Sequence, residues 1–312
     1  MSIVTLTMNP AIDIATGVER VRPTDKMRCT PPRFDPGGGG INVARAVAAL
    51  GAPVTAVFPS GGPAGVLLED LVRVTGVPTR TIPVATQTRQ NIAVTEDASG
   101  DQYRFVFPGA RLTAPEQHRC LAEVERLAAG CEYLVASGSL PPGVPAHFYQ
   151  TLADLAADLG VRLILDTSGA ALRAVRGGVY LMKPSVRELA DLVGGPLPAP
   201  ADRIAAARRL IDTGVSEIVV VSLGAEGALA VRAGGAQRFE AIEVTVRSGI
   251  GAGDAMVGGM TVGLSRGLPL DDAVRLGIAS ATAALGTPGT APGHPARIAE
   301  LYRETTAAAT AR

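Results

Sequence analysis

DRIAAARRLIDTGVSEIVVVS, residues 202–222, is the stretch from which the fold class follows. Apolar residues recur in it at helical spacing, namely Ile204, Ala207, Leu210 and Ile211. Asp202 can cap the start of this helix and Gly214 can end it. Val219–Val221 follows as a continuous β-branched run, the pattern of a parallel strand buried on both faces. The stretch therefore predicts a helix that leads into a parallel strand, which is the unit of an α/β fold.

The same alternation of β-branched runs with longer runs rich in Ala, Leu and Arg extends along the chain. The expected strands are Ile3–Thr7, Val54–Phe58, Tyr133–Ser137, Arg162–Asp166, Tyr180–Met182, Glu217–Ser222 and Ala228–Arg232. The expected helices are Ile41–Leu50, Gly65–Thr75, Ala114–Ala129, Ala146–Leu159, Val186–Val193, Asp202–Thr213, Ala255–Leu264, Asp271–Leu285 and Ala296–Thr305. This order indicates a mostly parallel central sheet with helices on both faces, whose ligands bind at the carboxyl ends of the strands.

Two segments, at about residues 14–35 and 88–108, lack helical periodicity. Within the second, Ile92–Thr95 and Tyr103–Phe107 flank a turn at Asp97–Gly100, which predicts a β-hairpin. We expect residues 1–312 to form a single domain in which the two segments make a small β-sheet lid. Because a small sheet has little stability of its own, we expect it to cover the active site, a partner subunit, or both.

Composition excludes several classes of protein. Lys plus Arg and Asp plus Glu number 29 each, so no charge excess favours nucleic acid or a membrane surface as a partner. Three scattered cysteines have neither metal-ligand spacing nor the pattern of a disulfide framework, which fits a reducing cytoplasm. We find no signal-peptide pattern and no apolar run of the ~18 residues that cross a bilayer. Three histidines argue against a catalytic triad or a histidine metal cluster.

Gly251-Ala252-Gly253-Asp254 is the strongest chemical signal, since it directly precedes an expected helix. Glycines let the backbone come close to a ligand, and the free N–H groups at a helix start favour negative charge. Asp254 is placed to take a proton from an attacking hydroxyl, while the amides of Ile250 to Gly253 stabilise a phosphoryl group. The segment alone is equally compatible with an ordinary helix cap.

Gly37–Gly40 followed by Ile41 and Asn42 is the second strong signal. Ordering each glycine costs about 1 kcal/mol, which a chain tolerates where another molecule touches the backbone. Asn42 offers a donor and an acceptor to sugar hydroxyls. A flexible hinge is the alternative interpretation of the run.

Charged residues near the expected lid suggest a sugar phosphate. Asp13 follows the first strand, where a carboxylate can hold two hydroxyls; a solvated loop aspartate is the alternative. Arg89 and Arg104 stand on the two strands of the hairpin, and Lys26 lies in the first lid segment. A pair of arginines can hold a phosphate with planar donor groups, although both can also lie on a solvated strand face.

Two further loops follow expected strands. Ser222–Gly227 contains two glycines three apart, a tight turn beside which a nucleotide can lie, but it is neither a Walker A loop nor the dinucleotide fingerprint. Lys183–Glu188 leads into another helix, where Glu188 could organise Mg²⁺ through water. A surface glutamate is the alternative.

Taken in order, these motifs resemble the PfkB-type carbohydrate kinases of the ribokinase-like superfamily, nearly end to end. Thr88–Asn91 and Ser137–Gly143 contribute to the resemblance. Within the family the chain is most similar to the minor bacterial 6-phosphofructokinases, which have Gly-Gly-Gly-Gly where kinases of fructose 1-phosphate or tagatose 6-phosphate usually have Gly-Gly-Lys-Gly. Gln102–Phe105 and Lys26–Thr30 also match that subgroup.

The resemblance implies ATP-dependent phosphorylation of fructose 6-phosphate at its 1-hydroxyl, with Asp254 as base and the amides of Gly251, Ala252 and Gly253 around the transferred group. The implied sugar-phosphate ligands are Asp13, Gly38, Gly39, Asn42 and Arg89, with Ser139, Arg104 and Lys26 as weaker candidates. The implied nucleotide site contains Lys183, Ser185, Ser222, Gly224 and Gly227. Mg²⁺ would be held through Glu188, and K⁺ by Ser248, Ile250, Ala284, Thr287 and Gly289. The lid would form a homodimer.

Other functions stay open at this point. The same chemistry could act on fructose 1-phosphate or tagatose 6-phosphate, and a sugar-phosphate or nucleotide sensor could keep the fold without turnover. The intact Gly251–Asp254 segment argues against a sensor, and Arg89 and Arg104 argue against a nucleoside kinase. Ser185 replaces the asparagine of the usual Asn-x-x-Glu motif; serine keeps a hydroxyl but loses the amide, which predicts weaker metal or nucleotide binding or a rearranged water network.

Overall fold

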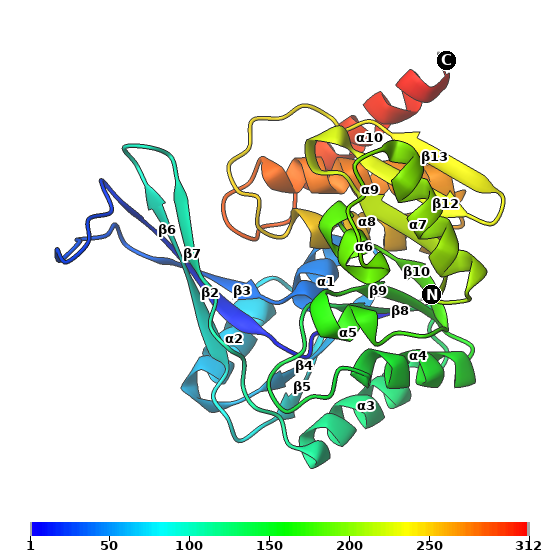
Figure 1. The fold of residues 1–312 in the computed structure, drawn as a ribbon. Helices are drawn as coiled ribbons and strands as arrows, with labels where there is room; N and C mark the ends of the chain where they lie inside the picture. The colour runs from blue at the N-terminus through cyan, green and yellow to red at the C-terminus, as the bar shows by residue number, and fades with distance from the viewer. Residues whose placement is uncertain (1, 311–312) are drawn as a thin grey trace.

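A large, mostly parallel sheet forms the centre of the protein (Figure 1). The computed structural model describes residues 2–310. In this range the sheet has nine strands in the order β13-β12-β11-β10-β9-β8-β1-β4-β5. Their bounds are β1 Ile3–Leu6, β4 Val54–Ser60, β5 Thr79–Pro83, β8 Tyr133–Ser137, β9 Arg162–Asp166, β10 Val179–Met182, β11 Ser216–Ser222, β12 Ala228–Arg232 and β13 Gly235–Phe239. The pairs from β5 to β11 are parallel, whereas β12 and β13 are antiparallel.

Helices cover both faces of this sheet, as expected (Figure 1). They are α1 Gly39–Ala49, α2 Gly62–Val74, α3 Ala114–Ala128, α4 Phe148–Asp158, α5 Gly169–Arg173, α6 Val186–Val193, α7 Pro200–Asp212, α8 Ala252–Ser265, α9 Leu270–Leu285 and α10 Pro295–Thr310. Strand β11 shows why both faces need cover. Ile218 and Val220 join the core under α1, α8 and α9, whereas Val219 and Val221 join the core under α3, α4 and α7.

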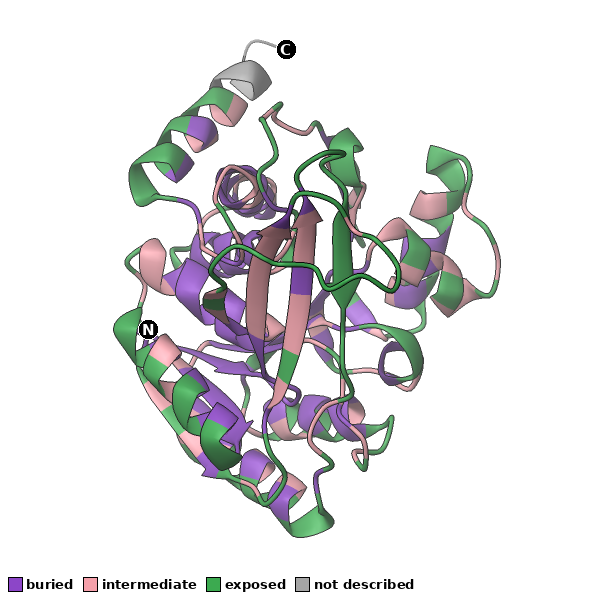
Figure 2. Cartoon of the chain, turned by 90° about the vertical axis from the view of Figure 1, so that its left-hand side faces the viewer, coloured by how far each residue is buried: buried purple, intermediate pink, exposed green. Residues whose placement is uncertain are grey.

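The two expected lid segments form a second sheet, of order β3-β2-β6-β7. Its strands are β2 Ala11–Val18, β3 Arg33–Gly37, β6 Arg89–Glu96 and β7 Gln102–Phe105. The predicted hairpin is confirmed as β6 and β7, but the sheet is mixed because β2 and β6 run parallel. Figure 2 faces this sheet and shows its residues mostly exposed or half-buried. Since β2 begins soon after β1 ends, the sheet rises from the carboxyl edge of the central sheet.

Several predicted boundaries were wrong. Helix α7 begins at Pro200, so Asp202 lies inside its first turn, where its carboxylate accepts a hydrogen bond from the Ala199 N–H at 3.0 Å. Proline suits the first helical position because its missing N–H would have no partner there. Helices α1 and α8 begin at Gly39 and Ala252, earlier than expected. Strands β5 and β13 and helix α5 were not predicted. In the described part of the chain, the helices are too short or too polar to cross a membrane.

Candidate active site

Asp254 lies in the first turn of α8 and is held there by two neighbouring elements. Gly251 precedes the helix in a left-handed conformation, with φ of 79°, which turns the chain into α8. The Ser137 hydroxyl at the end of β8 donates to Oδ1 of Asp254, and the Asn42 amide on α1 donates to Oδ2, both at 3.0 Å. The carboxylate is therefore fixed in orientation beside the free N–H groups of the helix start.

The pKa of Asp254 is raised to about 7. Removal from water is the main cause, and the nearby Asp166 carboxylate adds to it; the hydrogen bonds from Asn42 and Ser137 and the charge of Lys183 act in the opposite direction. A carboxyl group whose pKa lies near neutrality can accept a proton more readily than an ordinary aspartate, which suits a general base.

Lys183, at the end of β10, lies beside the reactive carboxylate. Its ammonium is 3.2 Å from Oδ2 of Asp166, and the side chain is only 6% exposed. Burial alone lowers the pKa of Lys183, but the carboxylates of Asp166, Glu188 and Asp254 outweigh it, so the pKa is raised and the ammonium stays charged. A Cβ atom at Gly253 would lie 3.7 Å from this ammonium. Lys183 is thus placed to face anionic groups bound in front of α8.

Sequence reasoning gave no role to Ser137 or Asp166. Both end strands, β8 and β9, that lie next to each other in the sheet. Their position at the carboxyl edge was the available signal, because polar residues that end parallel strands meet at the ligand-binding edge.

The glycine run is tightly packed, which does not support the interpretation as a flexible hinge. A Cβ atom at Gly37 would lie 2.3 Å from a carboxylate oxygen of Asp13, and one at Gly39 would lie 2.2 Å from Oγ of Ser137. Gly38 has a φ of 117°, and a Cβ atom there would lie 2.6 Å from the Thr7 side chain. The run therefore brings the start of α1, and with it Asn42, against the ends of β1 and β8.

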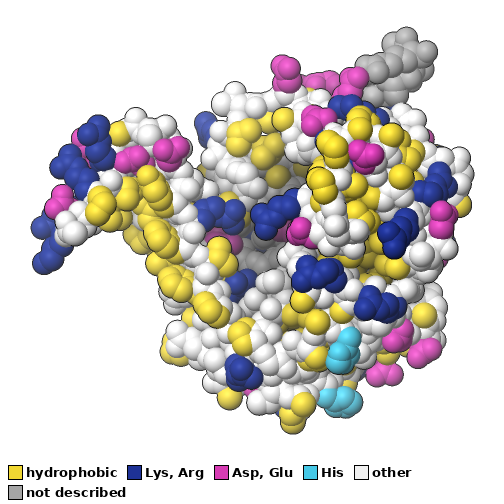
Figure 3. All heavy atoms as spheres, in the orientation of Figure 1, with side chains coloured by type: hydrophobic (Ala, Val, Ile, Leu, Met, Phe, Trp, Pro, Cys, Tyr) yellow, Lys and Arg dark blue, Asp and Glu magenta, His cyan; other side chains and the backbone are white. Residues whose placement is uncertain are grey.

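The sugar-phosphate candidates gather where the two sheets meet. The Asn91 amide donates to Asp13 at 2.8 Å. Arg89 donates to the carbonyl oxygens of Asn9, at 2.9 Å, and Phe107, at 3.0 Å, while its buried Nε has no partner. Arg104 lines the same small pocket as Asp13. The pKa of Asp13 is raised, because burial outweighs the hydrogen bond from Asn91 and the charges of Arg89 and Arg104, which lower it. Figure 3 shows a hollow at this junction with Lys and Arg side chains at its margin.

Lys26 does not lie among these residues within the chain, so its part in sugar-phosphate binding stays a prediction. Lys26 is exposed in the segment between β2 and β3, which starts beyond Val18. Asp13 lies five residues before the end of β2, about 16 Å along the strand. Figure 1 shows this segment projecting away from the central sheet. Ser139 is closer to the site: its hydroxyl accepts a hydrogen bond from the Asn9 amide at 3.0 Å, and Ser139 is exposed.

The nucleotide candidates lie together at the ends of β10 and β11. Ser185 and Ser222 are paired by an isolated bridge. Ser185 caps α6. Its backbone N–H and its hydroxyl both donate to Oε2 of Glu188, at 2.7 and 2.8 Å. Serine therefore keeps Glu188 oriented, as a capping box does. Gly224 has open space around it, whereas a Cβ atom at Gly227 would collide with the Phe239 carbonyl oxygen at 2.0 Å.

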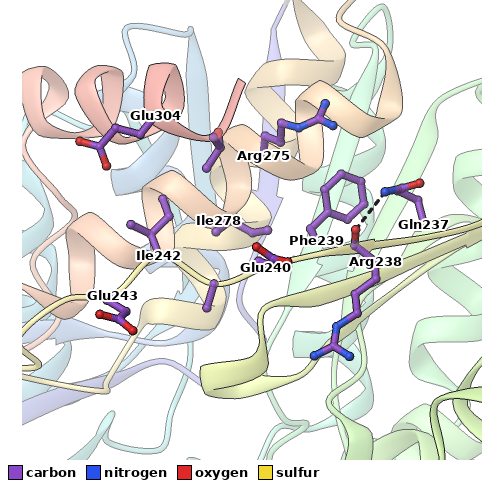
Figure 4. A pocket seen from close by; sticks show the side chains of 11 residues that line it. Gln237, Arg238, Phe239, Glu240, Ile242, Glu243, Arg275, Ile278 and Glu304 are labelled. Atoms are coloured by element: carbon purple, nitrogen blue, oxygen red, sulfur yellow. Dashed lines mark hydrogen bonds between the residues drawn. The ribbon is translucent and has the colours of Figure 1, made fainter. Parts of the chain in front are cut away.

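A cavity of about 560 Å³ lies beside this turn, because Phe239 and Ala241, which a Cβ atom at Gly227 would contact, belong to its lining (Figure 4). Phe239, Ile242 and Ile278 form its apolar wall, and the charged lining consists of Arg238, Glu240, Glu243, Arg275 and Glu304. Arg275 is paired with Asp272 at 2.7 Å, and Arg238 with Glu226 at 3.4 Å. With its arginines paired and three glutamates in its lining, the cavity suits an uncharged planar group better than a phosphate.

The residues implied for K⁺ come from two loops. The Ser248 N–H donates to the Leu285 carbonyl oxygen at 3.3 Å, which joins the segment before α8 to the end of α9. The Ala284 carbonyl oxygen accepts the Thr287 N–H and hydroxyl, so it is already engaged by protein donors. Gly289 packs against Arg33 and Asp35 of β3, while Ile250 and Gly289 line the pocket of Asp13. Within residues 2–310, no three His, Cys, Asp or Glu side chains cluster as metal ligands.

Relatives of known name match almost the whole chain. A family described as pfkB family carbohydrate kinase matches residues 6–297. An ATP-dependent 6-phosphofructokinase isozyme 2 from Mycobacterium tuberculosis is 55% identical over 289 residues, which are 93% of this chain and 85% of that protein. A 1-phosphofructokinase from Xanthomonas campestris pv. campestris is 36% identical over 279 residues, 88% of this chain and 86% of that protein.

Solved structures agree with the sequence matches. Phosphofructokinase-2 from Escherichia coli in complex with fructose-6-phosphate has a TM-score of 0.91 and 41% identity, and the match covers 97% of this chain and 99% of that one. The same enzyme in complex with potassium has a TM-score of 0.93 and 42% identity over the same shares. Its tetrameric inhibited form has a TM-score of 0.91. With the Asp254 site, the glycine run and these matches together, the chain belongs to the pfkB family of carbohydrate kinases.

Proposed function

We propose that the protein transfers the γ-phosphoryl group of ATP to the 1-hydroxyl of fructose 6-phosphate. Asp254 carries the proposal, because a carboxyl group with a pKa of about 7 is held by Asn42 and Ser137 at the start of α8. Asp254 accepts the proton of the 1-hydroxyl as the new O1–P bond forms. The bond from the γ-phosphorus to its bridging oxygen breaks, and ADP leaves. The amides of Gly251, Ala252 and Gly253 stabilise the charge on the transferred group.

The sugar phosphate would lie between the two sheets. Asp13 accepts hydrogen bonds from sugar hydroxyls, and Asn42 with the backbone of Gly38 and Gly39 lines the sugar. Arg89 and Arg104 hold the 6-phosphate, since guanidinium groups bind phosphate through several donors at once. The free Nε of Arg89 supports this placement, because a buried donor without a partner is costly unless a ligand supplies one. Ser139 is a weaker contact.

ATP would lie along the ends of β10 and β11. Lys183, Ser185, Ser222, Gly224 and Gly227 contact its phosphates and ribose, and the nucleobase extends toward the cavity beside Phe239. Mg²⁺ keeps most of its waters and binds phosphates with one or two carboxylates, so the second oxygen of Glu188 fits the role of an outer ligand. Bound Mg²⁺ neutralises charge on the phosphates. K⁺ would be held by Ser248, Ile250, Ala284, Thr287 and Gly289. We propose the cytoplasm as its location, because ATP and sugar phosphates are its proposed substrates.

We further propose a single domain whose small sheet is a lid and a dimer interface. The lid exposes large apolar side chains, Phe34, Tyr103, Phe105, Val106 and Phe107, with Val106 62% exposed. Clustered exposed apolar residues mark interaction surfaces. Light scattering at micromolar concentration is expected to give the mass of a dimer, and Phe105→Glu is expected to give the monomer. A monomeric parent protein would contradict the interface.

The substrate is tested by kcat/KM with MgATP and K⁺ on fructose 6-phosphate, fructose 1-phosphate and tagatose 6-phosphate, measured in parallel. We expect fructose 6-phosphate to be preferred at least ~10-fold, a difference of about 1.4 kcal/mol in transition-state binding. Omitting Mg²⁺, or replacing K⁺ by tetramethylammonium, is expected to lower the rate. Preference for another sugar would overturn the substrate but keep the role of Asp254, and no turnover with any sugar would favour a sensor.

A further inference from the structure

Arg45 is a buried arginine that the proposed chemistry does not use. It lies on α1, one turn after Asn42, and is 7% exposed. Burial lowers its pKa, and the carboxylates of Asp35 and Asp13 act in the opposite direction. Its Nε has no hydrogen-bond partner. A buried guanidinium with an unsatisfied donor lowers the free energy of unfolding, so stability alone does not explain why Arg45 is buried here.

The guanidinium of Arg45 contacts strand β3, helix α1 and the loop between α9 and α10. Its Nη1 donates to the Thr290 carbonyl oxygen at 2.9 Å and to the Thr290 hydroxyl at 2.8 Å, and it lies 3.4 Å from the Pro36 carbonyl oxygen of β3. The same nitrogen lies 3.3 Å from Oδ1 of Asn42. Nη1 carries two hydrogens. It therefore makes its short hydrogen bonds to Thr290 and a longer, shared hydrogen bond to the Asn42 oxygen.

Arg45 and Asp254, on either side of the Asn42 amide, fix the orientation of that amide. Arg45 has only donors, so it faces the amide oxygen. Asp254 in its ionised form has only acceptors, so it faces the amide NH₂, which donates at 3.0 Å. With the amide reversed, the NH₂ would face a cation and the oxygen would face a carboxylate. Without Arg45 only the Asp254 side would oppose that reversal.

We propose that Arg45 is a positioning residue that keeps the Asn42 NH₂ on Asp254 and anchors this orientation to Thr290 and the base of the lid strand β3. The proposal rests on the proposed kinase function. Gly251, which turns the chain into α8, also lies against this group: a Cβ atom there would be 3.7 Å from Nδ2 of Asn42 and 3.9 Å from the Thr290 Cα. The anchor and the start of α8 are therefore in contact.

The test compares Arg45→Met, Asn42→Ala and the double variant across pH. The charged groups that face Asp254 are Asp166 and Lys183, and neither is changed. For Arg45→Met we expect the acid limb of kcat to move up by ~0.5–1 pH unit and kcat at pH 7 to fall about 2- to 5-fold, with KM for both substrates within about 2-fold. In the Asn42→Ala background Arg45→Met is expected to add nothing further, because Arg45 acts through Asn42.

The control is Arg162→Met, which removes a guanidinium that bonds to Glu132 and Tyr133. Arg162 lies at the amino end of β9, whereas the site lies at the carboxyl ends of the strands. It is expected to lower Tm without moving the acid limb. An unmoved limb in Arg45→Met, or effects that multiply in the double variant, would overturn the proposal. If Arg45→Met does not fold, Arg45→Lys and Thr290→Val carry the test, with a smaller shift in the same direction.

A second readout does not depend on turnover. The ¹⁵N side-chain amide signal of Asn42, assigned by its loss in Asn42→Ala, is expected to shift with pH near 7 in the parent protein and to lose that titration in Arg45→Met. A protein that is inactive on all three sugars but keeps this titration would refute the kinase proposal and retain the positioning role. An identical titration in both proteins would refute the positioning role.

Discussion

Asp254→Asn is expected to lower kcat by a factor of at least ~10² while ATP binding stays nearly unchanged, as a general base contributes ~10²–10⁴-fold. Asparagine has the same shape, and its amide can still accept from Asn42 and donate toward Ser137, so the start of α8 keeps its structure. Only the acceptor of the proton is lost. Steady-state kinetics and calorimetric titration with ATP measure the two effects separately.

The pH dependence of the parent enzyme checks the same assignment. Because the pKa of Asp254 is about 7, kcat/KM is expected to fall below about pH 7 as the base becomes protonated. Asp254→Asn is expected to lose this limb. Near-parental turnover in the variant, or a limb that persists in its residual activity, would rule out Asp254 as the base.

Asp254→Asn is also expected to raise Tm at pH 8. The folded pKa lies above the ordinary value of 3.8, so the folded protein binds this proton more tightly than the unfolded chain does. The stability gained from the neutral form is present below pH 3.8 and is lost as pH rises through about 7. The variant does not ionise, so its advantage in thermal unfolding is expected at pH 8 and to shrink toward pH 4.

Arg89→Met is expected to raise KM for the sugar phosphate about 10²-fold, since removing one partner of a buried charge pair costs ~2–5 kcal/mol. Two carbonyl oxygens, of Asn9 and Phe107, already hold its guanidinium, so no ordering is needed when the phosphate binds. KM for ATP is expected to stay unchanged, because Arg89 lies at the base of the lid.

Two matched variants bracket this result. Arg104→Met removes a more exposed guanidinium that lines the same pocket and is expected to have a smaller effect. Arg80→Met removes an exposed arginine of β5 beside Glu123 and is expected to change neither KM. Equal losses for Arg89 and Arg80 would show that general charge, rather than a phosphate contact, is responsible.

The sequence predicted the buried strands well and the edge strands poorly. Val219–Val221 and Leu134–Ala136 are continuous apolar runs, which only a strand covered on both faces requires. Strands β5 and β13 lie at the two edges of the sheet, and several of their side chains, including Arg80 and Arg238, face solvent. Their composition is that of a loop, and only pairing with β4 and β12 makes them strands.

The site was predicted in its motifs but not in its contacts. Asp254, Asn42 and the glycine run stand out because several glycines beside a helix start occur twice in the chain, each time next to a polar side chain that can contact a ligand. Ser137 and Asp166 do not stand out, because each is one polar residue at the end of a strand. Their partners Asp254 and Lys183 lie far along the chain, and only strand order brings them together.

The central position of β1 has a consequence for synthesis on the ribosome. β1 lies between β4 and β8, so its second neighbour exists only when residues 133–137 have emerged. Until then the nascent chain exposes an unpaired apolar strand edge, which is a site for aggregation. Asp254 follows later still, after every strand of both sheets. A nascent chain can therefore assemble both sheets before it has any means of catalysis.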